Sequence, residues 1–514
     1  MEGIASIQRE KDTMQSRQPT RGPRVIIIGS GIGGLGMAVN LGNAGIGDVT
    51  ILEQGPDLGG VWRDNTYPGV ACDVPSTLYS YSFAKQTGFS MRYPGQKDIQ
   101  SYLRRVAAEH GVTDKIEYDS RVVRATFDED LGQWEVLTED GKRRHCDVLI
   151  PAVGTLARPR LPEIRGREDF TGPAFHSARW QHDVDLDGKD VAVIGTGASA
   201  LQFVPHLQRQ VRKLTVYQRS APYVMPMHNY SYDKGFKRFL GTRFMRLADR
   251  FGYWALMEVG QYAFSRSPKI SNMMASMALK QLEKQVPDPE LRAKLTPDHQ
   301  VGCKRVLFSS RYYPALTQPN VEVLVDGIEE ITADGVTTTD GQSRSHDVLV
   351  YGTGFRTDDI LGHIEITGRD GRLLADSWKE GAEAYLGISV KHFPNMFLVY
   401  GPNTDLGSGS IPYMLESQMR YIKQAVTHLA ELPAGTSLTV RDTVHDEFVA
   451  WVERNFRNTP WTSGCSNWYT NAAGRVVTNW PQRSGRYRRR TKTFDPTVYQ
   501  VGTAERATAP AAGR

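Results

Sequence analysis

Two glycine-rich turns of one kind constrain the fold of this 514-residue chain more than any other feature. Each turn follows an apolar strand pattern and opens an apolar helical pattern, which is the order found in a dinucleotide-binding unit. The glycines allow a tight bend and the close approach of a pyrophosphate, which then faces the helix N-terminus. Two such units predict two nucleotide sites. The expected contact residues are Gly29, Ser30, Gly31 and Gly34 in the first turn, and Gly195, Thr196, Gly197, Ala198, Ser199 and Ala200 in the second.

The two turns differ in the residue expected to bind the ribose. In both units this residue lies 24 positions after the first glycine of the turn. Glu53 follows the first turn, and a carboxylate there can accept both ribose hydroxyls of an adenosine, as FAD requires. Arg219 follows the second turn, with Ser220 beside it and no acid nearby. Guanidinium and hydroxyl groups bind a 2′-phosphate that a carboxylate would repel. The sequence therefore predicts FAD at the first turn and NADPH, in preference to NADH, at the second.

A second repeated pattern indicates how each unit closes its sheet. Residues 147–150 read Asp-Val-Leu-Ile and residues 347–350 read Asp-Val-Leu-Val, and each run leads to a Gly-Thr pair. We therefore expect an α/β fold of two Rossmann-like dinucleotide-binding domains, with a helical insertion in the second. The expected division is a disordered leader 1–22, an FAD-binding domain of 23–157 and 350–502, an NADPH-binding domain of 158–349 with its insertion at about 234–294, and a disordered tail 503–514.

The expected insertion is rich in methionine and in aromatic residues at helical spacing. Such a stripe is more often part of a hydrophobic core than of a ligand pocket. We therefore expect the residues of the stripe to be buried, namely Phe244, Leu247, Phe251, Trp254 and Met257.

The charge of the chain is concentrated in one segment. The formal net charge of +5 comes from 62 Lys and Arg against 57 Asp and Glu, and six of the cations lie between residues 483 and 492. A run of this kind is usually solvated, so we expect a solvated segment and no nucleic-acid partner.

The four cysteines are widely spaced and form no C-x-x-C pair: Cys72, Cys146, Cys303 and Cys465. No apolar run approaches the roughly 20 residues needed to cross a bilayer, and the first 22 residues are polar where a secretory signal would be apolar. We therefore expect reduced thiols, a cytoplasmic location and no stable membrane insertion.

A motif between the two turns resembles a known family fingerprint. Phe170, Gly172, His176 and Trp180 stand at the spacing F-x-G-x-x-x-H-x-x-x-W, which is similar to the fingerprint of type I Baeyer-Villiger monooxygenases. The family often has Pro or Asp after the tryptophan, where this chain has Gln181. The resemblance implies that this segment is a conformational linker, in which His176 couples the two domains and takes no part in the chemistry.

A longer pattern strengthens the resemblance. Residues 59–73 are similar to the family pattern [AG]-G-x-W-x-x-x-x-[FY]-P-[GM]-x-x-x-D at every constrained position. Related flavin monooxygenases that oxidise nitrogen or sulfur share the glycine turns and lack this pattern. The resemblance implies that Trp62 lines the flavin. The further cofactor contacts that we expect are Val61, Asp73, Tyr79, Val122 and Gln202.

The resemblance implies an FAD-dependent NADPH monooxygenase of the Baeyer-Villiger type. In that family NADPH reduces FAD, and reduced flavin and O2 form a C4a-peroxide that converts a small-molecule ketone to an ester or lactone. The residue implied to stabilise the peroxide is Arg305, and a permanent cation suits that role because it has no proton to lose. The resemblance also implies Asp73 as the catalytic carboxylate beside Arg305, and Lys304 as a contact of the NADPH 2′-phosphate.

Near the C-terminus, Asn467-Trp468-Tyr469 resembles the family segment whose tryptophan closes over the bound nucleotide, with Trp480 as the alternative. No metal site is expected. Three other functions stay open at this point. The chain could be a flavin-containing monooxygenase that forms N- or S-oxides, or a non-catalytic nucleotide-binding homologue. It could also be a disulfide-type reductase, which would need a redox cysteine pair near the flavin, and the cysteine spacing shows none.

Overall fold

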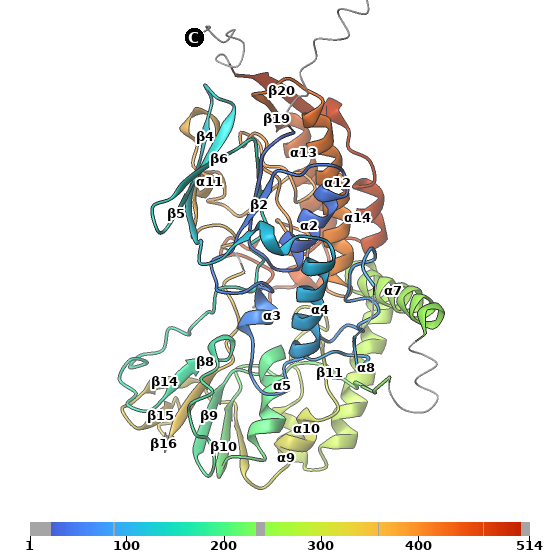
Figure 1. The fold of residues 1–514 in the computed structure, drawn as a ribbon. Coiled ribbons are helices and arrows are strands. Elements are labelled where there is room, and N and C mark those ends of the chain that lie inside the picture. The colour runs from blue at the N-terminus through green and yellow to red at the C-terminus, as the bar shows by residue number, and fades with distance from the viewer. Residues whose placement is uncertain (1–21, 86–87, 233–241, 358, 466, 505–514) are drawn as a thin grey trace, which may run out of the picture.

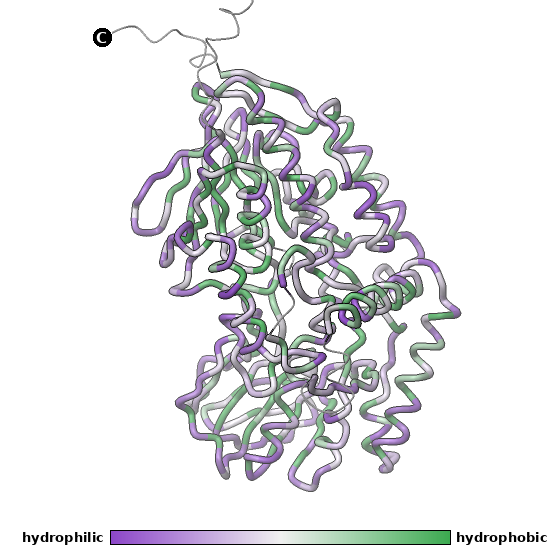
Figure 2. Tube along the Cα trace, turned by 45° about the vertical axis from the view of Figure 1, so that its right-hand side comes forward, coloured by the Kyte–Doolittle hydropathy of each residue, from purple (hydrophilic) through white to green (hydrophobic). Residues whose placement is uncertain are grey.

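The computed structural model describes residues 22–85, 88–232, 242–357, 359–465 and 467–504. Figure 1 shows two lobes, each containing a parallel sheet, with helices packed around both. Figure 2 shows hydrophobic segments inside both lobes and hydrophilic segments along their outer loops. The prediction of an α/β fold is therefore confirmed.

The first lobe is built on four parallel strands, in the order β3-β2-β1-β7. These strands are β1 (Val25–Ile28), β2 (Val49–Leu52), β3 (Ile116–Glu117) and β7 (Val148–Pro151). β1 and β7 are buried along their whole length, as their unbroken apolar sequences require in a parallel sheet. The helices grouped beside this sheet are α2 (Ile32–Gly42), α3 (Val61–Asp64), α4 (Gln96–Glu109) and α12 (Ile411–Ala430).

The rest of the first lobe joins segments that are far apart in the sequence. In a second sheet of order β18-β4-β5-β6, β18 pairs in parallel with β4. Its strands are β4 (Val122–Asp128), β5 (Gln133–Thr138), β6 (Arg143–Cys146) and β18 (Glu365–Thr367). The C-terminal part adds α11 (Leu374–Ser377), β19 (Thr436–Val440), α13 (Asp442–Phe456), α14 (Ser484–Arg490) and β20 (Tyr499–Thr503).

The second lobe repeats the parallel arrangement in the order β13-β10-β9-β17-β8. These strands are β8 (Ala174–His176), β9 (Asp190–Ile194), β10 (Lys213–Tyr217), β13 (Val321–Leu324) and β17 (Val348–Tyr351). Helices α5 (Ala198–Leu207) and α10 (Tyr312–Leu316) pack against each other in this lobe. Smaller sheets are formed by β11 (Val224–Met225) with β12 (Leu307–Phe308), and by β14 (Ile328–Ile331), β15 (Gly335–Thr338) and β16 (Ser343–Ser345).

Two connecting segments run side by side between the lobes. The backbone N–H of Arg160 donates to the carbonyl of Gly354 at 2.9 Å, and that of Arg356 donates to the carbonyl of Arg158 at 3.0 Å. The Thr353 hydroxyl adds a 2.5 Å hydrogen bond to the carbonyl of Arg160. The two connecting segments are therefore held to each other by hydrogen bonds.

Among the described residues between β11 and β12, three helices occur: α7 (Arg243–Arg266), α8 (Pro268–Gln285) and α9 (Pro289–Lys294). Helix α7 projects from the right-hand side of the molecule in Figure 1. The expectation that its apolar stripe is buried is wrong for three residues, since Phe244, Leu247 and Phe251 are 77%, 55% and 67% exposed. Trp254 and Met257 are half-buried against the first-lobe core. The periodicity indicated an amphipathic helix correctly, but the charged side of α7 faces inward.

The folded part of the C-terminal region extends beyond residue 502, where the sequence analysis expected it to end. Thr503 is the last residue of β20 and Ala504 is buried, so these two residues are not part of a disordered tail. The basic run at 483–492 contains α14, whose Tyr487 is fully buried against Trp480 at a ring distance of 5.0 Å. This run is therefore part of the packed fold. The rest of the expected tail, 505–514, and the expected leader up to residue 21 lie outside the described residues.

Candidate active site

The first glycine turn is shaped for a pyrophosphate. Gly29 has φ of +99°, and a Cβ on it would lie 2.9 Å from the carbonyl oxygen of Ala152. A Cβ on Gly34 would overlap the carbonyl oxygen of Gly29. Helix α2 begins after Gly31 without a side-chain cap, so its first N–H groups are free to bind an anion. The turn therefore fits the FAD pyrophosphate.

Glu53 lies at this turn with its carboxylate buried. Its Oε2 accepts hydrogen bonds from the N–H and the hydroxyl of Ser30 at 2.9 and 2.7 Å. Its Oε1 accepts from the Gly55 N–H at 2.9 Å and pairs with Arg63 at 2.6 Å. The carboxylate is thus held where an adenosine ribose would meet it, and a ribose hydroxyl would compete with Ser30 for Oε2. Val122, the other contact expected here, is buried in β4, two residues after Ser120, whose N–H donates to the carbonyl of Glu53 at 2.8 Å.

The second glycine turn has the same geometry in the other lobe. Gly195 has φ of +108°, and a Cβ on it would lie 2.5 Å from the carbonyl oxygen of Gly352. Helix α5 begins after Gly197, again without a side-chain cap. The Thr196 hydroxyl donates to the carbonyl of Ser220 at 3.1 Å, so the turn is tied to the loop after β10. An uncapped helix start beside this loop fits a second pyrophosphate.

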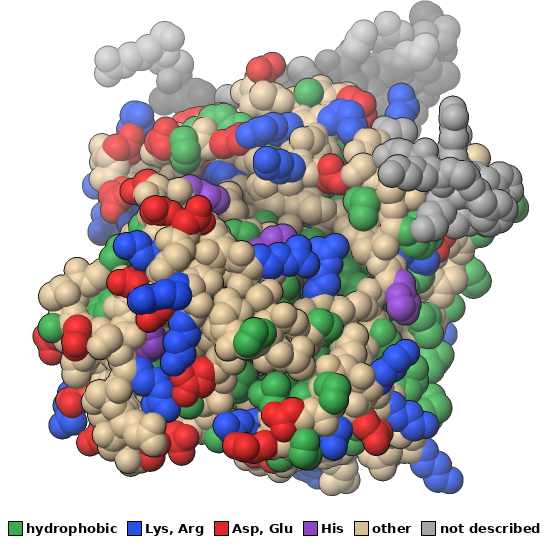
Figure 3. Space-filling view, turned by 90° about the horizontal axis from the view of Figure 1, so that it is seen from below, with side chains coloured by type: hydrophobic (Ala, Val, Ile, Leu, Met, Phe, Trp, Pro, Cys, Tyr) green, Lys and Arg blue, Asp and Glu red, His purple; other side chains and the backbone are tan. Residues whose placement is uncertain are grey.

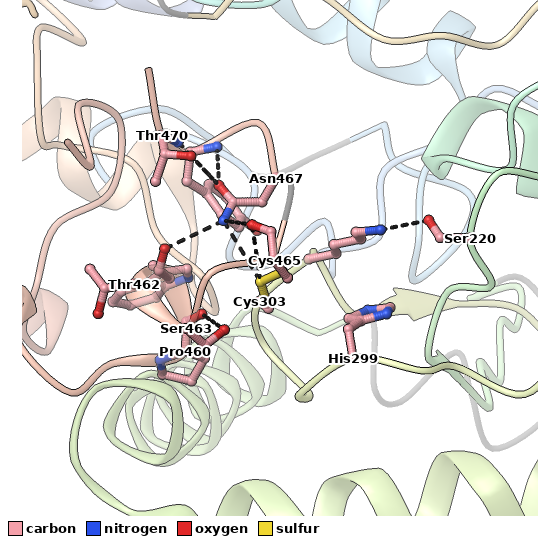
Figure 4. Close-up of a disulfide and its surroundings, with 12 residues drawn as sticks. Ser220, His299, Cys303, Pro460, Thr462, Ser463, Cys465, Asn467 and Thr470 are labelled. Carbon is pink, nitrogen blue, oxygen red and sulfur yellow. Dashed lines mark hydrogen bonds between the residues drawn. A yellow bond between two sulfur atoms is a disulfide. The ribbon is translucent and has the colours of Figure 1, made fainter. Parts of the chain in front are cut away.

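Two positive side chains gather beside the second turn. The Lys304 ammonium donates to the Ser220 hydroxyl at 2.6 Å, a contact drawn as a dashed line in Figure 4. Burial, together with the positive charge of Arg219, lowers the pKa of Lys304. Two cations this close repel each other unless an anion lies between them. The cluster of Arg219, Ser220 and Lys304 therefore fits a bound 2′-phosphate.

Arg305 and Asp73 form an ion pair. The Nη2 atom of Arg305 lies 2.8 Å from the Oδ2 atom of Asp73, although 232 residues separate them in the sequence. The Asp73 charge raises the pKa of Arg305, so the guanidinium stays protonated. The side chains are 35% and 24% exposed, so the pair is reachable from solvent. A fixed positive charge in a partly enclosed position can stabilise negative charge that develops on an oxygen atom.

The segment that holds Asp73 is fastened to both lobes. The indole N–H of Trp62, which follows Val61 at the start of α3, donates to the Tyr79 hydroxyl at 3.0 Å. The Tyr67 hydroxyl donates to Gln202 of α5 at 2.9 Å, and the Gln202 amide donates to the carbonyl of Ala71 at 2.8 Å. Gln202 thus joins the second lobe to the loop that leads to Asp73.

Two residues that the sequence analysis missed lie near the ion pair. Asp405 is buried, and burial raises its pKa although the positive charge of Arg305 opposes the shift. Burial raises the pKa of Tyr400 as well, and the charge of Asp405 adds to the effect. Tyr400 also has φ of +67°, a rare conformation for a residue other than glycine, and such strain often occurs at functional sites. The sequence signal for these two residues was the run Gly401-Pro402-Asn403, a turn-forming loop that lies between them.

Cys303 and Cys465 form a disulfide, so the expectation of four reduced thiols and of no cysteine pair is wrong. Their Cα atoms lie 6.5 Å apart across a separation of 162 residues, which local spacing could not reveal. Cys72 and Cys146 are free and buried. Figure 4 shows Asn467 over the pair, where its amide donates to the carbonyl of Cys465 at 3.1 Å. The bond ties the backbone next to Arg305 to the segment that contains Trp468.

The two tryptophans considered as a nucleotide cover occupy different environments. Trp480 is fully buried in the first-lobe core, with its ring 5.5 Å from that of Trp451. Trp468 is partly buried beside Tyr469, and its carbonyl accepts a 2.8 Å hydrogen bond from Thr357. Trp468 is therefore the one of the two with surface that a ligand could contact.

The linker motif is packed into the second lobe. Gly172 has no room for a side chain, because a Cβ would lie 2.6 Å from the carbonyl oxygen of Asp347. Trp180 packs edge-on against Phe175, with 5.2 Å between the ring centres. His176 accepts a 3.1 Å hydrogen bond from the N–H of Ala178. Phe170 is half-buried against a separate small core cluster of the same lobe.

His176 also contacts a connecting segment between the lobes. Its ring lies 5.7 Å from that of Phe355, one residue before the Arg356 N–H that bonds the other connecting segment. The position suits a residue that responds to movement of the lobes. Within the described parts of the chain, no group of three or more His, Cys, Asp and Glu side chains is placed to hold a metal ion.

Comparisons with known proteins place the sequence and the fold among flavin-dependent monooxygenases. The family model for pyridine nucleotide-disulphide oxidoreductases matches residues 26–235. A Baeyer-Villiger monooxygenase from Streptomyces coelicolor is 42% identical over 483 residues, which cover 93% of this chain and 92% of the relative. The closed crystal structure of cyclohexanone monooxygenase superposes with a TM-score of 0.84 at 26% identity, covering 94% of this chain and all of that one.

A third match bears on the cofactors. The crystal structure of OTEMO in complex with FAD and NADP superposes with a TM-score of 0.84 at 25% identity, again over 94% of this chain and all of that one. The two glycine turns, Glu53 and the Arg219 cluster supply sites that fit the same two nucleotides. The chain belongs to the Baeyer-Villiger monooxygenases, and FAD and NADPH are its cofactors.

Proposed function

We propose that the protein uses NADPH and O2 to convert a ketone to an ester or lactone, with Arg305 as the catalytic cation. The reaction inserts one oxygen atom of O2 between the carbonyl carbon and a neighbouring carbon. The other oxygen atom leaves as water, and NADPH supplies two electrons. Bound FAD, reduced by NADPH, supplies the activation of O2. The observation that carries the proposal is the Arg305–Asp73 ion pair at 2.8 Å.

Arg305 stabilises the negative charge that develops on oxygen during this reaction. Its guanidinium cannot lose a proton at any working pH, and Asp73 raises its pKa further. Asp73 fixes the position of the guanidinium by binding its Nη2 atom, and the remaining N–H groups of the guanidinium can donate to a ligand. A preformed charge needs no reorganisation during the reaction, which makes it an efficient catalyst.

The second nucleotide site selects NADPH through its charge. Arg219 and Lys304 bind the 2′-phosphate, and Ser220 positions Lys304 by the 2.6 Å hydrogen bond. The repulsion that lowers the pKa of Lys304 is relieved when the phosphate binds between the two cations. Trp468 would contact the bound nucleotide through its exposed surface, and His176 would couple this site to the connecting segment that holds Phe355.

The test is product analysis with the FAD-loaded enzyme, NADPH and air. One reaction contains cyclohexanone, because a similar structure is that of cyclohexanone monooxygenase, and parallel reactions contain a long-chain linear ketone and a steroid ketone. A thioether serves as the competing substrate. An ester or lactone from any ketone supports the proposal. Sulfoxide alone, with no ester from the whole panel, would identify an S-oxidising enzyme and contradict it.

A further inference from the structure

Helix α7 has its charged side turned inward. Asp249 pairs with Arg92 at 2.5 Å and accepts a 2.7 Å hydrogen bond from the Thr77 hydroxyl. Arg250 donates to the carbonyls of Thr77 and Ser80 at 2.9 and 3.1 Å. These contacts bind the polar side of α7 to the first lobe and fix the rotation of the helix about its axis.

The opposite side of α7 is apolar and faces solvent. Its large exposed residues are Phe244, Leu247, Phe251, Leu256, Val259 and Tyr262, and we call them the α7 face. Four charged residues lie on α7 between Phe244 and Tyr262. Arg246 packs over the Tyr232 ring at 4.9 Å, and the contacts of Asp249, Arg250 and Glu258 are with the first lobe. Met273 and Met277 of α8 are also about half exposed. Figure 3 shows hydrophobic side chains along the right-hand edge, the side on which α7 projects in Figure 1. An exposed apolar face this long marks an interaction surface.

A group of cations lies next to the α7 face. A cavity of about 480 Å³ is lined by Trp254 of α7, Tyr413 of α12, and six basic residues that we call the α14 cluster: Arg420, Arg483, Arg486, Arg488, Arg489 and Lys492. Among the described residues, Glu258 is the one acid lining the cavity, and its Oε1 already accepts from the N–H and the hydroxyl of Ser484 at 2.8 and 2.5 Å. The same contacts hold α14 against α7. The α14 cluster therefore carries an excess of positive charge, and most of its side chains are exposed.

We propose that the α7 face and the α14 cluster together form a docking surface for an anionic membrane. An apolar helix face enters the boundary between headgroups and acyl chains, while neighbouring cations bind the lipid phosphates. No described helix of the protein is long and apolar enough to cross a bilayer. In the proposed arrangement α7 lies parallel to the membrane, with the α7 face turned toward it. A second copy of the chain fits less well, because a symmetric contact through this surface would bring two α14 clusters together.

The test is co-sedimentation of the FAD-loaded enzyme with vesicles. One set contains phosphatidylcholine alone, and the other contains about 30% phosphatidylglycerol, which gives the negative surface that basic residues bind. We expect binding to the anionic vesicles only, and weaker binding at about 0.5 M NaCl because salt screens the cations. The double variant Phe244→Ser and Phe251→Ser should lower the partition coefficient about tenfold or more. Leu131→Ser, an exposed leucine on the β4–β5 hairpin, is the matched control and should leave binding unchanged.

A second pair of variants tests the cations. Arg486→Glu with Arg489→Glu should weaken binding to anionic vesicles, whereas Lys379→Glu near α11 should not. NADPH oxidation measured without vesicles should be equal in all these variants, which shows that they fold. Equal binding of the Phe variant and the wild type would overturn the proposal, as would no binding to any vesicle. Dimerisation by light scattering that the Phe variant abolishes, without vesicle binding, would assign the surface to a second copy.

Discussion

Arg305 and Asp73 meet at 2.8 Å, with Asp73 supplied by the loop after α3 and Arg305 by the segment before β12. The pair thus connects the first lobe to the segment that follows the helical insertion. Its partial exposure leaves the guanidinium accessible to a ligand, while the carboxylate holds it in place. This relationship makes the pair the first target for mutation.

Replacement of Arg305 by alanine should separate the two halves of the reaction. We expect FAD reduction by NADPH to persist, because the proposed role of Arg305 follows that step. Ester formed per NADPH consumed should fall on the order of 100-fold, the usual effect of removing one preorganised electrostatic contact. Stopped-flow absorbance of the flavin and quantified product measure the two halves. The control is Arg311→Ala, which changes an exposed arginine close to Arg305 in the sequence. An unchanged product yield in Arg305→Ala would show that Arg305 has no part in the mechanism.

Asp73→Asn should act on the same step through the position of Arg305. The amide has the same shape and can still accept a hydrogen bond, but it lacks the charge that holds the guanidinium. We expect coupling of NADPH oxidation to product to fall less than in Arg305→Ala. Measurement of the double variant should then show non-additive losses, because the two residues act as one unit. Additive losses would mean that Asp73 acts independently of Arg305.

The sequence predicted the parts of the site that depend on local spacing. The glycine turns, Glu53 and Arg219 each follow from the geometry of a strand, a turn and a helix, so their placement could be inferred without a structure. The Cys303–Cys465 bond could not, because it depends on how two distant segments fold together. The α7 face was missed for a different reason. Helical periodicity identifies an apolar side but does not say whether that side faces the core or the solvent.

Arg219→Ala should weaken the binding of NADPH and leave NADH nearly unaffected. The lost contact is a charge-assisted hydrogen bond worth roughly 1.5 to 3 kcal/mol, or about tenfold or more in affinity. Fluorescence titration of the FAD-loaded enzyme with each nucleotide measures both constants. Arg212→Ala is the control, because it removes a surface ion pair between Arg212, just before β10, and Asp190, the first residue of β9. Equal weakening for both nucleotides would show that Arg219 does not read the 2′-phosphate.

Reduction of the Cys303–Cys465 bond should lower the thermal stability of the protein. A cross-link that closes a loop of this length restricts the unfolded chain by up to about 5 kcal/mol in the chain-entropy model. We expect dithiothreitol to lower the Tm of the wild type and to leave the Tm of Cys465→Ser unchanged. Reduction should also free the segment around Trp468 from the backbone beside Arg305, which limited proteolysis would detect. An identical response of wild type and variant to dithiothreitol would show that the two thiols are not linked in solution.

The buried imidazole of His176 should make stability depend on pH. Burial lowers the pKa of His176 to about 4, against about 6.5 for an exposed histidine. Between pH 6.5 and pH 4, His176 is protonated in the unfolded chain but neutral in the folded protein. Acid therefore favours unfolding. The stabilising contribution is complete above pH 6.5 and is lost as the pH falls toward 4, with about 2 kcal/mol lost between pH 7 and pH 5. Urea unfolding followed by tryptophan fluorescence at pH 7 and pH 5 measures the difference.

His176→Asn keeps an acceptor for the Ala178 N–H but has no proton to gain, so its stability should fall less on acidification. A second histidine, His346, whose pKa burial also lowers to about 4, supplies the comparison, since His346→Asn should remove a similar share of the pH dependence. The same acid sensitivity in His176→Asn as in the wild type would show that His176 titrates normally and is not enclosed in the folded protein.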